Sequence, residues 1–308
     1  MTVKVPPLKC QGIKTKLTEW IKDHSTYENN GTWIEPFMGS GVVGFNVAPR
    51  RAIFADVNPH IINFYNAIKN GKITAGSAKE FLEREGALLQ KQGEDHYYRV
   101  RERFNKDFDP FDFLFLNRAC FNGVMRFNKK GLYNVPFGHK PERFAKAYIT
   151  KITNQIKYVS QATSQFDWMF VCSDFRQIIS SASQGDFIYC DPPYMGRHTD
   201  YYNSWGEPEE QELYSLLKET QAKFILSTWH SNRYRTNPAI ERYAYHFTIL
   251  TREHFYHVGA SEENRNPMLE AIVLNYNPLT PIDLQAEKQL ALLEKKQKES
   301  YVLYSTPA

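Results

Sequence analysis

The sequence has few cysteines and no long hydrophobic run. It contains four cysteines among its 308 residues, and no two of them form a Cys-x-x-Cys pair. This pattern argues against a disulfide scaffold and a zinc ribbon, and favours a reducing compartment. The first ten residues lack the apolar segment of a signal peptide. Nor does any window approach the roughly 18 uninterrupted apolar residues of a membrane span, so we expect no contact with a membrane.

Internal repeats and low-complexity segments are also missing. Hydrophobic residues make up 42% of the chain and aromatic residues 15%, while glycine and proline number 16 each. This composition excludes a disordered tail and a collagen-like filament. The length suits one large domain, or one domain that carries a sizeable insertion.

Positive charge is concentrated in one part of the chain. The formal net charge is only +4, but residues 118–157 contain nine Lys or Arg and one acid, Glu142. This segment therefore carries +8 and the rest of the chain −4. Asn and aromatic residues alternate with the basic ones, a mixture that suits phosphate contacts and polar recognition of base edges. A solvated basic surface would have the same charge, so nucleic acid is one of two interpretations.

Short β-rich runs recur along the chain, and several are almost entirely apolar, as in strands buried on both faces. Helical patterns lie between them, for example at 59–69 and 207–219. This alternation predicts an α/β fold with a seven-stranded, mostly parallel, Rossmann-like sheet. The last two runs, joined through 259–267, favour an antiparallel hairpin. The predicted strands are 33–37, 51–56, 169–174, 186–190, 223–229, 246–252 and 270–276.

More than 100 residues separate the second and third predicted strands, far beyond the length of a loop. Helical patterns fill much of this interval, and one of them has Asp109 as N-cap and Pro110 at its first position. Two short strands around a turn are expected near its end, and then a helix with isoleucines on one face. The predicted helices are 78–91, 95–106, 109–121 and one that contains Ile149, Ile152, Ile156 and Val159; the predicted strands are 124–128 and 132–137.

These patterns predict three parts. Residues 1–58 and 160–280 would form the domain that holds the sheet, and 59–159 would be a mainly helical insertion that contains the whole basic segment. Residues 281–308 would form a C-terminal extension with a charged amphipathic helix at 284–303.

A glycine-rich loop follows the first predicted strand and begins a helix. Gly39, Gly41 and Gly44 let the backbone turn tightly and approach a ligand without an intervening Cβ. Asp56 ends the next strand, 17 residues after Gly39, where a carboxylate can accept hydrogen bonds from both ribose hydroxyls of an adenosine. The pattern fits dinucleotide enzymes and methyltransferases equally, and it also occurs as a turn without a ligand.

Two further details favour S-adenosylmethionine. Glu35, Pro36 and Phe37 precede the loop and place a carboxylate beside the glycines. That acid would repel a pyrophosphate but not a sulfonium ligand that carries an amino group. Asp174 and Phe175 end the third strand and offer an acceptor and a ring to an adenine.

The tetrapeptide Asp-Pro-Pro-Tyr at 191–194 follows the fourth predicted strand. Its prolines donate no hydrogen bond and fix the backbone with free carbonyls. Hydrogen bonds from an exocyclic adenine amine to Asp191 and to the carbonyl of Pro192 would localise the nitrogen lone pair toward a methyl donor. Tyr194 could stack on a base that has left the duplex. This chemistry needs no metal and no covalent intermediate.

The order of these motifs resembles that of the Dam-type DNA adenine-N6 methyltransferases of bacteria and phages. The resemblance extends from Lys9 to about Asn277. It rests on 9–14 (KCQGIK), 35–41 (EPFMGSG), 56–58 (DVN), 65–66 (YN), 116–118 (LNR), 121–123 (FNG), 126–128 (RFN), 133–138 (YNVPFG) and 191–194 (DPPY). Three positions depart from the family pattern: Cys10 replaces a Trp, Ile13 replaces one of two glycines, and Phe121 stands where many members carry Tyr. We therefore do not predict the recognised base sequence.

This resemblance implies a role for each matched residue. The catalytic residues would be Asp191, Pro192 and Tyr194. S-adenosylmethionine would be bound by Cys10, Lys14, Glu35, Pro36, Phe37, Gly39, Gly41, Asp56, Asp174, Phe175 and Asp191. Double-stranded DNA would be contacted by Lys9, Arg118, Phe121, Asn122, Arg126, Asn134 and Pro136, so that the insertion becomes the target-recognition domain. The resemblance also implies a monomer in the cytoplasm of a bacterial or phage-infected cell, and it allows a cognate restriction endonuclease as partner.

Other functions remain open at this point. The same fold could methylate cytosine N4, RNA or a protein amide, although such sites more often have Asn or Ser before Pro-Pro. A nicotinamide dehydrogenase would use the glycine loop and Asp56, but would leave the tetrapeptide and the basic segment unexplained. A non-catalytic DNA-binding subunit would bind DNA without turnover.

Overall fold

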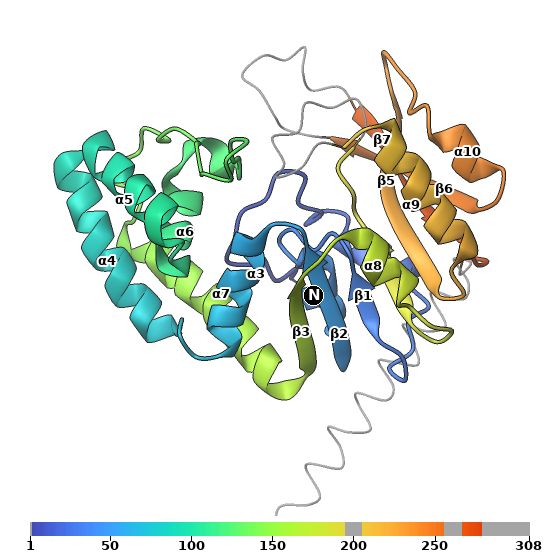
Figure 1. The fold of residues 1–308 in the computed structure, drawn as a ribbon, viewed down its shortest axis with the longest axis horizontal. Coiled ribbons are helices and arrows are strands. Elements are labelled where there is room, and N and C mark those ends of the chain that lie inside the picture. Colours follow the sequence, from blue (N-terminus) through green and yellow to red (C-terminus); the bar gives the residue numbers. More distant parts are fainter. Residues whose placement is uncertain (1, 195–204, 256–266, 279–308) are drawn as a thin grey trace, which may run out of the picture.

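The computed structural model describes residues 2–194, 205–255 and 267–278, and a seven-stranded sheet forms its centre (Figure 1). The strand order is β3-β2-β1-β4-β5-β7-β6. β7 is antiparallel to both of its neighbours, and the other pairs are parallel. This arrangement confirms the predicted Rossmann-like fold and the antiparallel final pair. The strands are β1 (Trp33–Glu35), β2 (Arg51–Asp56), β3 (Asp167–Cys172), β4 (Phe187–Cys190), β5 (Lys223–Asn232), β6 (Thr248–Phe255) and β7 (Pro267–Leu274).

Some strands begin or end about two residues from their predicted limits. β3 begins at Asp167 because its backbone N–H donates to the carbonyl of Arg50, which extends the pairing with β2. At the centre of the sheet, Trp33 of β1 lies opposite Phe187 of β4, and their rings stack with centroids 5.1 Å apart. The connection at 259–267 lies almost wholly outside the described residues, and the predicted helix at 284–303 lies entirely outside them.

Two buried clusters cover the two faces of the sheet. Alternate residues along β1 and β2 point to opposite sides, so Trp33 and Phe54 join one cluster while Ile34 and Ala55 join the other. The first cluster receives side chains from α1 (Thr18–His24), α2 (Val42–Val47) and α3 (Pro59–Lys69). The second receives them from α8 (Phe175–Ser180), α9 (Glu207–Glu219) and α10 (Ile240–Ala244).

The helices α4, α5 and α6 stand to one side of the sheet, beside α3 and α7 (Figure 1). Their bounds are α4 (Ala75–Gln92), α5 (Glu94–Asp107), α6 (Pro110–Ala119) and α7 (Lys146–Gln165), with a short 3-10 helix η1 (Phe121–Gly123) between the last two. α6 begins as expected, since the Asp109 side chain accepts a hydrogen bond from the Phe111 N–H and Pro110 is the first helical residue. Side chains of these helices belong to the same buried cluster as Trp33 and Phe54, so sheet and helices share one core.

The prediction of two strands at 124–128 and 132–137 was wrong. This segment is a folded-back loop with isolated bridges at Phe127–Tyr133 and Cys120–Phe137. The Asn105 side chain of α5 bonds both the N–H and the carbonyl of Tyr133, at 2.8 and 3.0 Å. These are the groups that a strand ladder would have used, and Pro136 has no N–H to offer.

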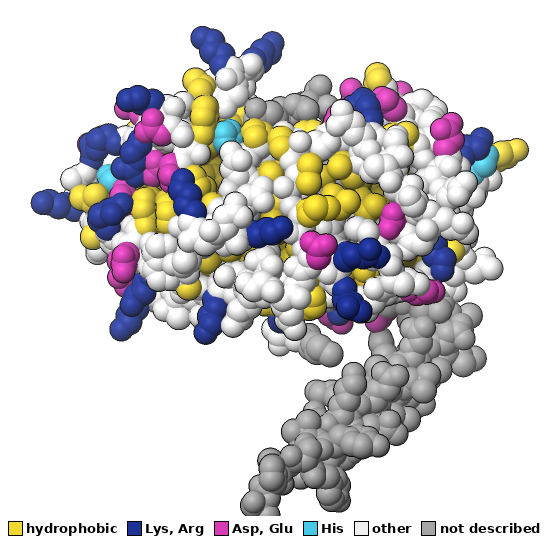
Figure 2. Space-filling model, turned by 60° about the horizontal axis from the view of Figure 1, so that its bottom comes forward, with side chains coloured by type: hydrophobic (Ala, Val, Ile, Leu, Met, Phe, Trp, Pro, Cys, Tyr) yellow, Lys and Arg dark blue, Asp and Glu magenta, His cyan; other side chains and the backbone are white. Residues whose placement is uncertain are grey.

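Basic and acidic side chains intermingle at both ends of the face that Figure 2 shows. On this face, charge alone therefore does not mark a binding surface. No helix in the described segments is long and apolar enough to cross a bilayer.

Candidate active site

A cavity of about 440 Å³ opens where β1, β2 and β4 end. The chain order reverses between β1 and β4, and ligands of such sheets bind at this switch point. The structure thus brings together most of the predicted donor-binding residues; Pro36 and Gly41 belong to the same loop but do not line the cavity. The predicted residues on its wall are Cys10, Lys14, Glu35, Phe37, Gly39, Asp56, Asp174, Phe175 and Asp191.

The glycine loop is held against the end of β2. Gly39 has a φ of 47°, and its N–H donates to Oδ2 of Asp56 at 2.9 Å. Gly41 has a φ of 74°, and a Cβ there would lie 2.9 Å from the Phe45 ring. A side chain at Gly41 would therefore both strain the backbone and press on the buried ring of Phe45.

Asp56 has both carboxylate oxygens engaged by backbone. Oδ2 accepts from Gly39 and Oδ1 from the N–H of Asn58, each at 2.9 Å. Burial raises the pKa of Asp56 to about 6, although these two hydrogen bonds favour the ionised form. Each oxygen keeps a second lone pair, so the carboxylate can still accept hydroxyl groups from a ribose.

Glu35 ends β1 in the wall of the same cavity. Its Oε1 accepts a hydrogen bond from Nε1 of Trp33 at 2.9 Å. Burial raises the pKa of Glu35 to about 8, so near neutral pH the carboxyl is mostly protonated. Its charge therefore depends on the ligand, because a cation nearby would favour the carboxylate.

Three aromatic rings form one wall of the cavity. Phe37 and Phe175 stack with centroids 5.2 Å apart, and Trp205 contacts both, at 5.4 and 5.5 Å. Asp174 lies beside them, where it caps α8 through the Arg176 N–H and pairs with the Arg176 guanidinium at 2.9 Å.

The carboxylate of Asp191 pairs with Lys14 inside the cavity. Nζ of Lys14 lies 2.7 Å from Oδ1 of Asp191, and it also donates to the carbonyl of Gly12 at 3.0 Å. Burial raises the pKa of Asp191, and the ammonium of Lys14 opposes this shift. Lys14 thus contacts the tetrapeptide itself and favours the ionised form of its carboxylate.

Tyr194 is fixed from the opposite end of the tetrapeptide. Its hydroxyl donates to Oε2 of Glu270 on β7 at 2.9 Å, and its ring packs with Trp229 and Met268. The ring is only 9% exposed. Pro193 lines the cavity, whereas Pro192 and Tyr194 do not.

Of the predicted DNA contacts, Phe121, Asn122 and Pro136 form one exposed turn. Phe121 is 52% exposed, and Asn122 has a φ of 52°, in the left-handed region. The Phe121 N–H donates to the Pro136 carbonyl at 3.0 Å, which joins the two parts of the turn. Met125, a few residues on, lines the cavity, so the turn stands at its rim.

The other predicted DNA contacts lie behind or beside this turn. Arg126 donates to Oδ1 of Asn134 at 2.9 Å, so two predicted contacts pair with each other. Lys9 is half-buried, and its backbone N–H donates to Asn117 at 2.8 Å. Arg118 is only 4% exposed, and its guanidinium donates to protein oxygens, including the carbonyl of Pro7 at 2.8 Å. Arg118 therefore lies in the interior rather than on the surface.

A family model for D12 class N6 adenine-specific DNA methyltransferases matches residues 11–258. The chain belongs to this family. It is 33% identical to the DNA adenine methylase of Haemophilus influenzae over 241 residues, which cover 74% of the chain and 79% of the relative. It is 34% identical to the DNA adenine methylase of Escherichia coli K12 over 257 residues, which cover 80% and 82%. The type II methyltransferase M.FokI of Planomicrobium okeanokoites shares 28% over 284 residues, which cover 89% of the chain and 43% of the relative.

These comparisons confirm the predicted class of enzyme. The chain is a DNA methyltransferase that transfers a methyl group from S-adenosylmethionine to adenine N6. The predicted resemblance to Dam-type enzymes is likewise confirmed, and the dehydrogenase interpretation falls away.

Sequence reasoning missed Trp205, which lines the methyltransferase cavity. Trp205 comes from the segment before α9, and its indole N–H donates to Oε2 of Glu210 at 3.0 Å. Tyr243 of α10 donates to the other oxygen of Glu210, so the ring is tied to two helices. No local pattern marks Trp205, because its position depends on how α9 packs. Among the described residues, no group of three or more His, Cys, Asp or Glu is placed to hold a metal ion.

Proposed function

We propose that this methyltransferase binds S-adenosylmethionine in the cavity at the ends of β1, β2 and β4, and holds the target adenine beside Asp191. The observation that carries the proposal is the shared cavity. Asp56, Glu35 and the Asp191–Lys14 pair all line it, so a nucleoside site and a site for an amine meet in one space. The cavity volume of about 440 Å³ suits a ligand of the size of S-adenosylmethionine.

The donor site needs an acceptor for ribose, an apolar wall for adenine and an acid for cationic groups. Asp56 supplies the acceptor, with Gly39 allowing close approach. Phe37, Phe175 and Trp205 supply the wall, and Cys10 lies 3.9 Å from a Cβ built on Gly39. Glu35 supplies the acid, and it becomes more acidic when a cation is bound. When bound, the donor supplies an electrophilic methyl group on a sulfonium.

Catalysis rests on how the protein orients the amine. We assign Asp191 to accept one N–H of the adenine N6 amine and the carbonyl of Pro192 to accept the other. These hydrogen bonds draw the lone pair out of conjugation and direct it at the methyl group. Lys14 favours the ionised form of Asp191. This form only accepts hydrogen bonds, whereas a protonated carboxyl would also donate one. Tyr194 is held by Glu270, and we assign its ring to stack on the flipped base.

DNA contact is assigned to the exposed turn and its neighbours. Phe121 and Asn122 project from the surface at the rim of the cavity, where an extruded base leaves a gap in the duplex. Arg126, Asn134 and Pro136 would lie against the same stretch of double-stranded DNA. We also assign Lys9 to DNA contact, because it lies beside Gly123. Arg118 would act on the DNA through its charge, from beneath the surface.

These assignments support a division of labour along the chain. We assign residues 1–58 and 160–280 to catalysis and the insertion at 59–159 to target recognition. α3 contacts β2 and β3, so the recognising part of the insertion begins after α3. A monomer in the bacterial or phage-infected cytoplasm, where the DNA lies, completes the proposal. The likeness to a type II methyltransferase makes a restriction endonuclease the natural partner to look for.

The proposal is tested with plasmid DNA that carries no methylated adenine. The protein is incubated with this DNA and labelled S-adenosylmethionine, and the nucleosides are analysed by mass spectrometry. We expect labelled N6-methyladenine from the wild type and none from Asp191→Asn, while both bind the donor. Labelled N4-methylcytosine, or turnover by Asp191→Asn, would overturn the assignment of Asp191.

A further inference from the structure

Three basic side chains surround the Tyr148 phenol, one from each of three segments. Arg143 Nη2 donates to the Tyr148 hydroxyl at 3.2 Å and Arg118 Nη1 donates to it at 3.3 Å. Nζ of Lys9 lies 6.0 Å from the ring centroid. We call Lys9, Arg118, Arg143 and Tyr148 the basic cluster.

The basic cluster has no counter-charge within the described part of the chain. No carboxylate there pairs with Lys9, Arg118 or Arg143; their side chains meet neutral groups and one another. Arg118 is nearly fully buried and donates to the carbonyl of Pro7 and to Gln155. The three cations lower the pKa of Tyr148 against the effect of burial, which reports a positive potential at its oxygen.

The Tyr148 hydroxyl accepts two hydrogen bonds and can still donate its own proton to another group. A phenol oxygen has two lone pairs, and two guanidinium groups already occupy the hydroxyl as donors. Its own O–H is therefore available to a further acceptor. Nη1 of Arg143 has no partner among the described residues, although Nε and Nη2 are both engaged. A positive site with free donors and no acid fits an anion with several oxygens.

The position of the basic cluster identifies the anion. The Lys9 side chain lies against Gly123, where a Cβ would come within 2.6 Å of it, so the cluster adjoins the exposed turn at Phe121 and Asn122. Lys9 also precedes Cys10, which lines the donor cavity. Any duplex that presents its adenine to this cavity must bring its backbone past the same rim.

We infer that Arg143, Tyr148 and Lys9 bind one backbone phosphate of the substrate DNA close to the target adenine, with Arg118 as a positioning charge beneath them. This contact fixes the register of the duplex and carries no sequence information. It deepens the DNA-binding role assigned above and rests on it.

The first experiment measures DNA affinity against salt concentration for the wild type, Arg143→Gln, Arg143→Lys and Tyr148→Phe. We expect Arg143→Gln to weaken binding about tenfold on any sequence, and to reduce the slope of log affinity against log salt by about 0.9. Arg143→Lys should keep the slope. Tyr148→Phe should weaken DNA binding but leave the slope unchanged. Lys218→Gln, on the exposed side of α9, is the matched control and should match the wild type.

The second experiment locates the phosphate. Duplexes with one neutral methylphosphonate at successive positions around the mapped target adenine are bound by the wild type and by Arg143→Gln. We expect the methylphosphonate at one position to weaken DNA binding by the wild type about tenfold. The same substitution should leave DNA binding by Arg143→Gln unchanged. The donor affinity of each variant reports whether it is folded. Its methylation rate at saturating DNA reports whether the proposed active site is intact.

Either of two results would overturn the inference. An unchanged salt slope in Arg143→Gln, with normal donor binding, would make the basic cluster structural. A change in the preferred target sequence would make Arg143 a base contact instead.

Discussion

Lys14 and Asp191 form an ion pair of 2.7 Å across 177 residues of sequence. Lys14 lies in the N-terminal segment and Asp191 follows β4, so the pair closes the cavity on one side. The Lys14 side chain is 4% exposed and the Asp191 side chain 22%, so Asp191 is the more exposed partner. The pair therefore presents a charged acceptor to an incoming amine.

Replacing Lys14 by Gln should move the acidic limb of the kcat–pH profile toward higher pH. Burial raises the pKa of Asp191 and Lys14 opposes it, so loss of the ammonium raises this pKa further and less carboxylate is present at a given pH. We expect kcat at pH 7 to fall about 10- to 100-fold, because a hydrogen bond to a charged group contributes about 1.5–3 kcal/mol. Steady-state kinetics from pH 5.5 to about 9 would show it, with the exposed Lys16→Gln as control. A lower kcat with an unmoved profile would speak for a purely geometric role.

Donor binding should release protons at neutral pH. Glu35 has a pKa of about 8 in the free site, so it carries a proton at pH 7. A cationic donor beside it lowers that pKa and expels the proton. Titration calorimetry in buffers of different ionisation enthalpy should report a release that is absent in Glu35→Gln. Equal release in both proteins would remove Glu35 from contact with the cation.

The same carboxyl should reduce stability as pH rises. A carboxyl whose folded pKa is raised from 4.5 to about 8 keeps a proton in the folded state that the unfolded chain has already lost. The free energy of unfolding therefore decreases across this interval. We expect Glu35→Gln to lose this decrease between pH 4.5 and about 8, as measured by urea unfolding. Parallel pH dependences of the two proteins would contradict the raised pKa.

Gly123→Ala should weaken DNA binding without affecting the donor. Gly123 has a φ of 68°, and a Cβ there would lie 2.6 Å from Cδ of Lys9. Gly71→Ala is the matched control, since its φ is 74° but no heavy atom lies within 4 Å of its Cβ. Both variants should lose about 1–2 kcal/mol of stability through the left-handed backbone. Only Gly123→Ala should lose DNA affinity; equal affinities would show that Lys9 accommodates the methyl group.

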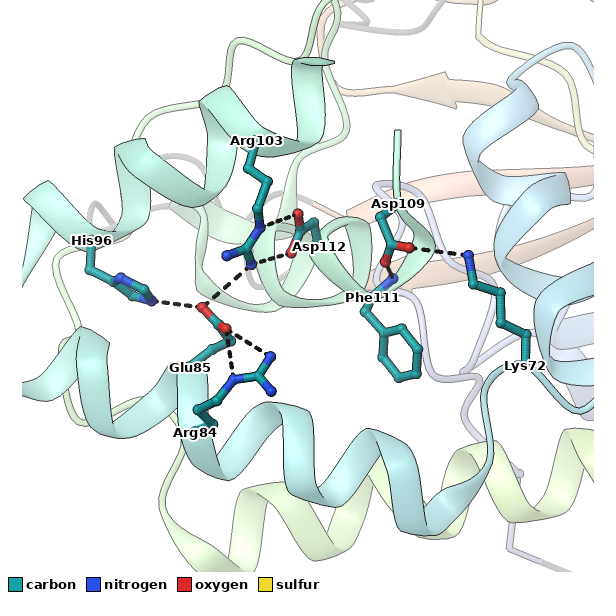
Figure 3. A network of polar contacts seen from close by, with 8 residues as sticks. All are labelled: Lys72, Arg84, Glu85, His96, Arg103, Asp109, Phe111 and Asp112. Atoms are coloured by element: carbon teal, nitrogen blue, oxygen red, sulfur yellow. Dashed lines mark hydrogen bonds and ion pairs between the residues drawn. The ribbon is translucent and has the colours of Figure 1, made fainter. Parts of the chain in front are cut away.

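The buried carboxylate of Glu85 joins three helices of the insertion (Figure 3). It meets His96 of α5 at 2.9 Å, Arg84 at 3.1 Å and Arg103 at 3.5 Å, and Arg103 binds Asp112 of α6 through two hydrogen bonds. Glu85, His96 and Asp112 are almost fully buried, whereas Arg84 and Arg103 are 64% and 44% exposed, so Glu85→Gln should lower the free energy of unfolding by about 1–3 kcal/mol, less than the loss of a fully buried ion pair. Glu83→Gln removes an exposed pair with Lys79 and should change it by less than about 0.5 kcal/mol. Similar values for the two variants in chemical denaturation would mean that the network contributes little.

Predictions from the sequence were correct where the residues of one segment determine the structure of that segment. Asp56 and Asp191 each follow an apolar strand, so their meeting at one edge follows from a parallel sheet. They failed where the outcome depends on segments far apart. Nothing near Arg118 shows that Pro7 and Gln155 will enclose it, and nothing near Tyr133 shows that Asn105 will occupy its backbone. Trp205 was missed for the same reason, since Glu210 and the two neighbouring rings decide its place.

The common core of sheet and helices has a consequence for engineering. Phe113 and Phe115 of α6 belong to the same buried cluster as Trp33 and Phe54 of the sheet. The insertion is not an independent unit, because cutting it out exposes one half of a single hydrophobic interior. Grafting the insertion onto another methyltransferase would transplant only half of this interior, so a chimera would need the sheet residues that pack against the insertion exchanged together with it.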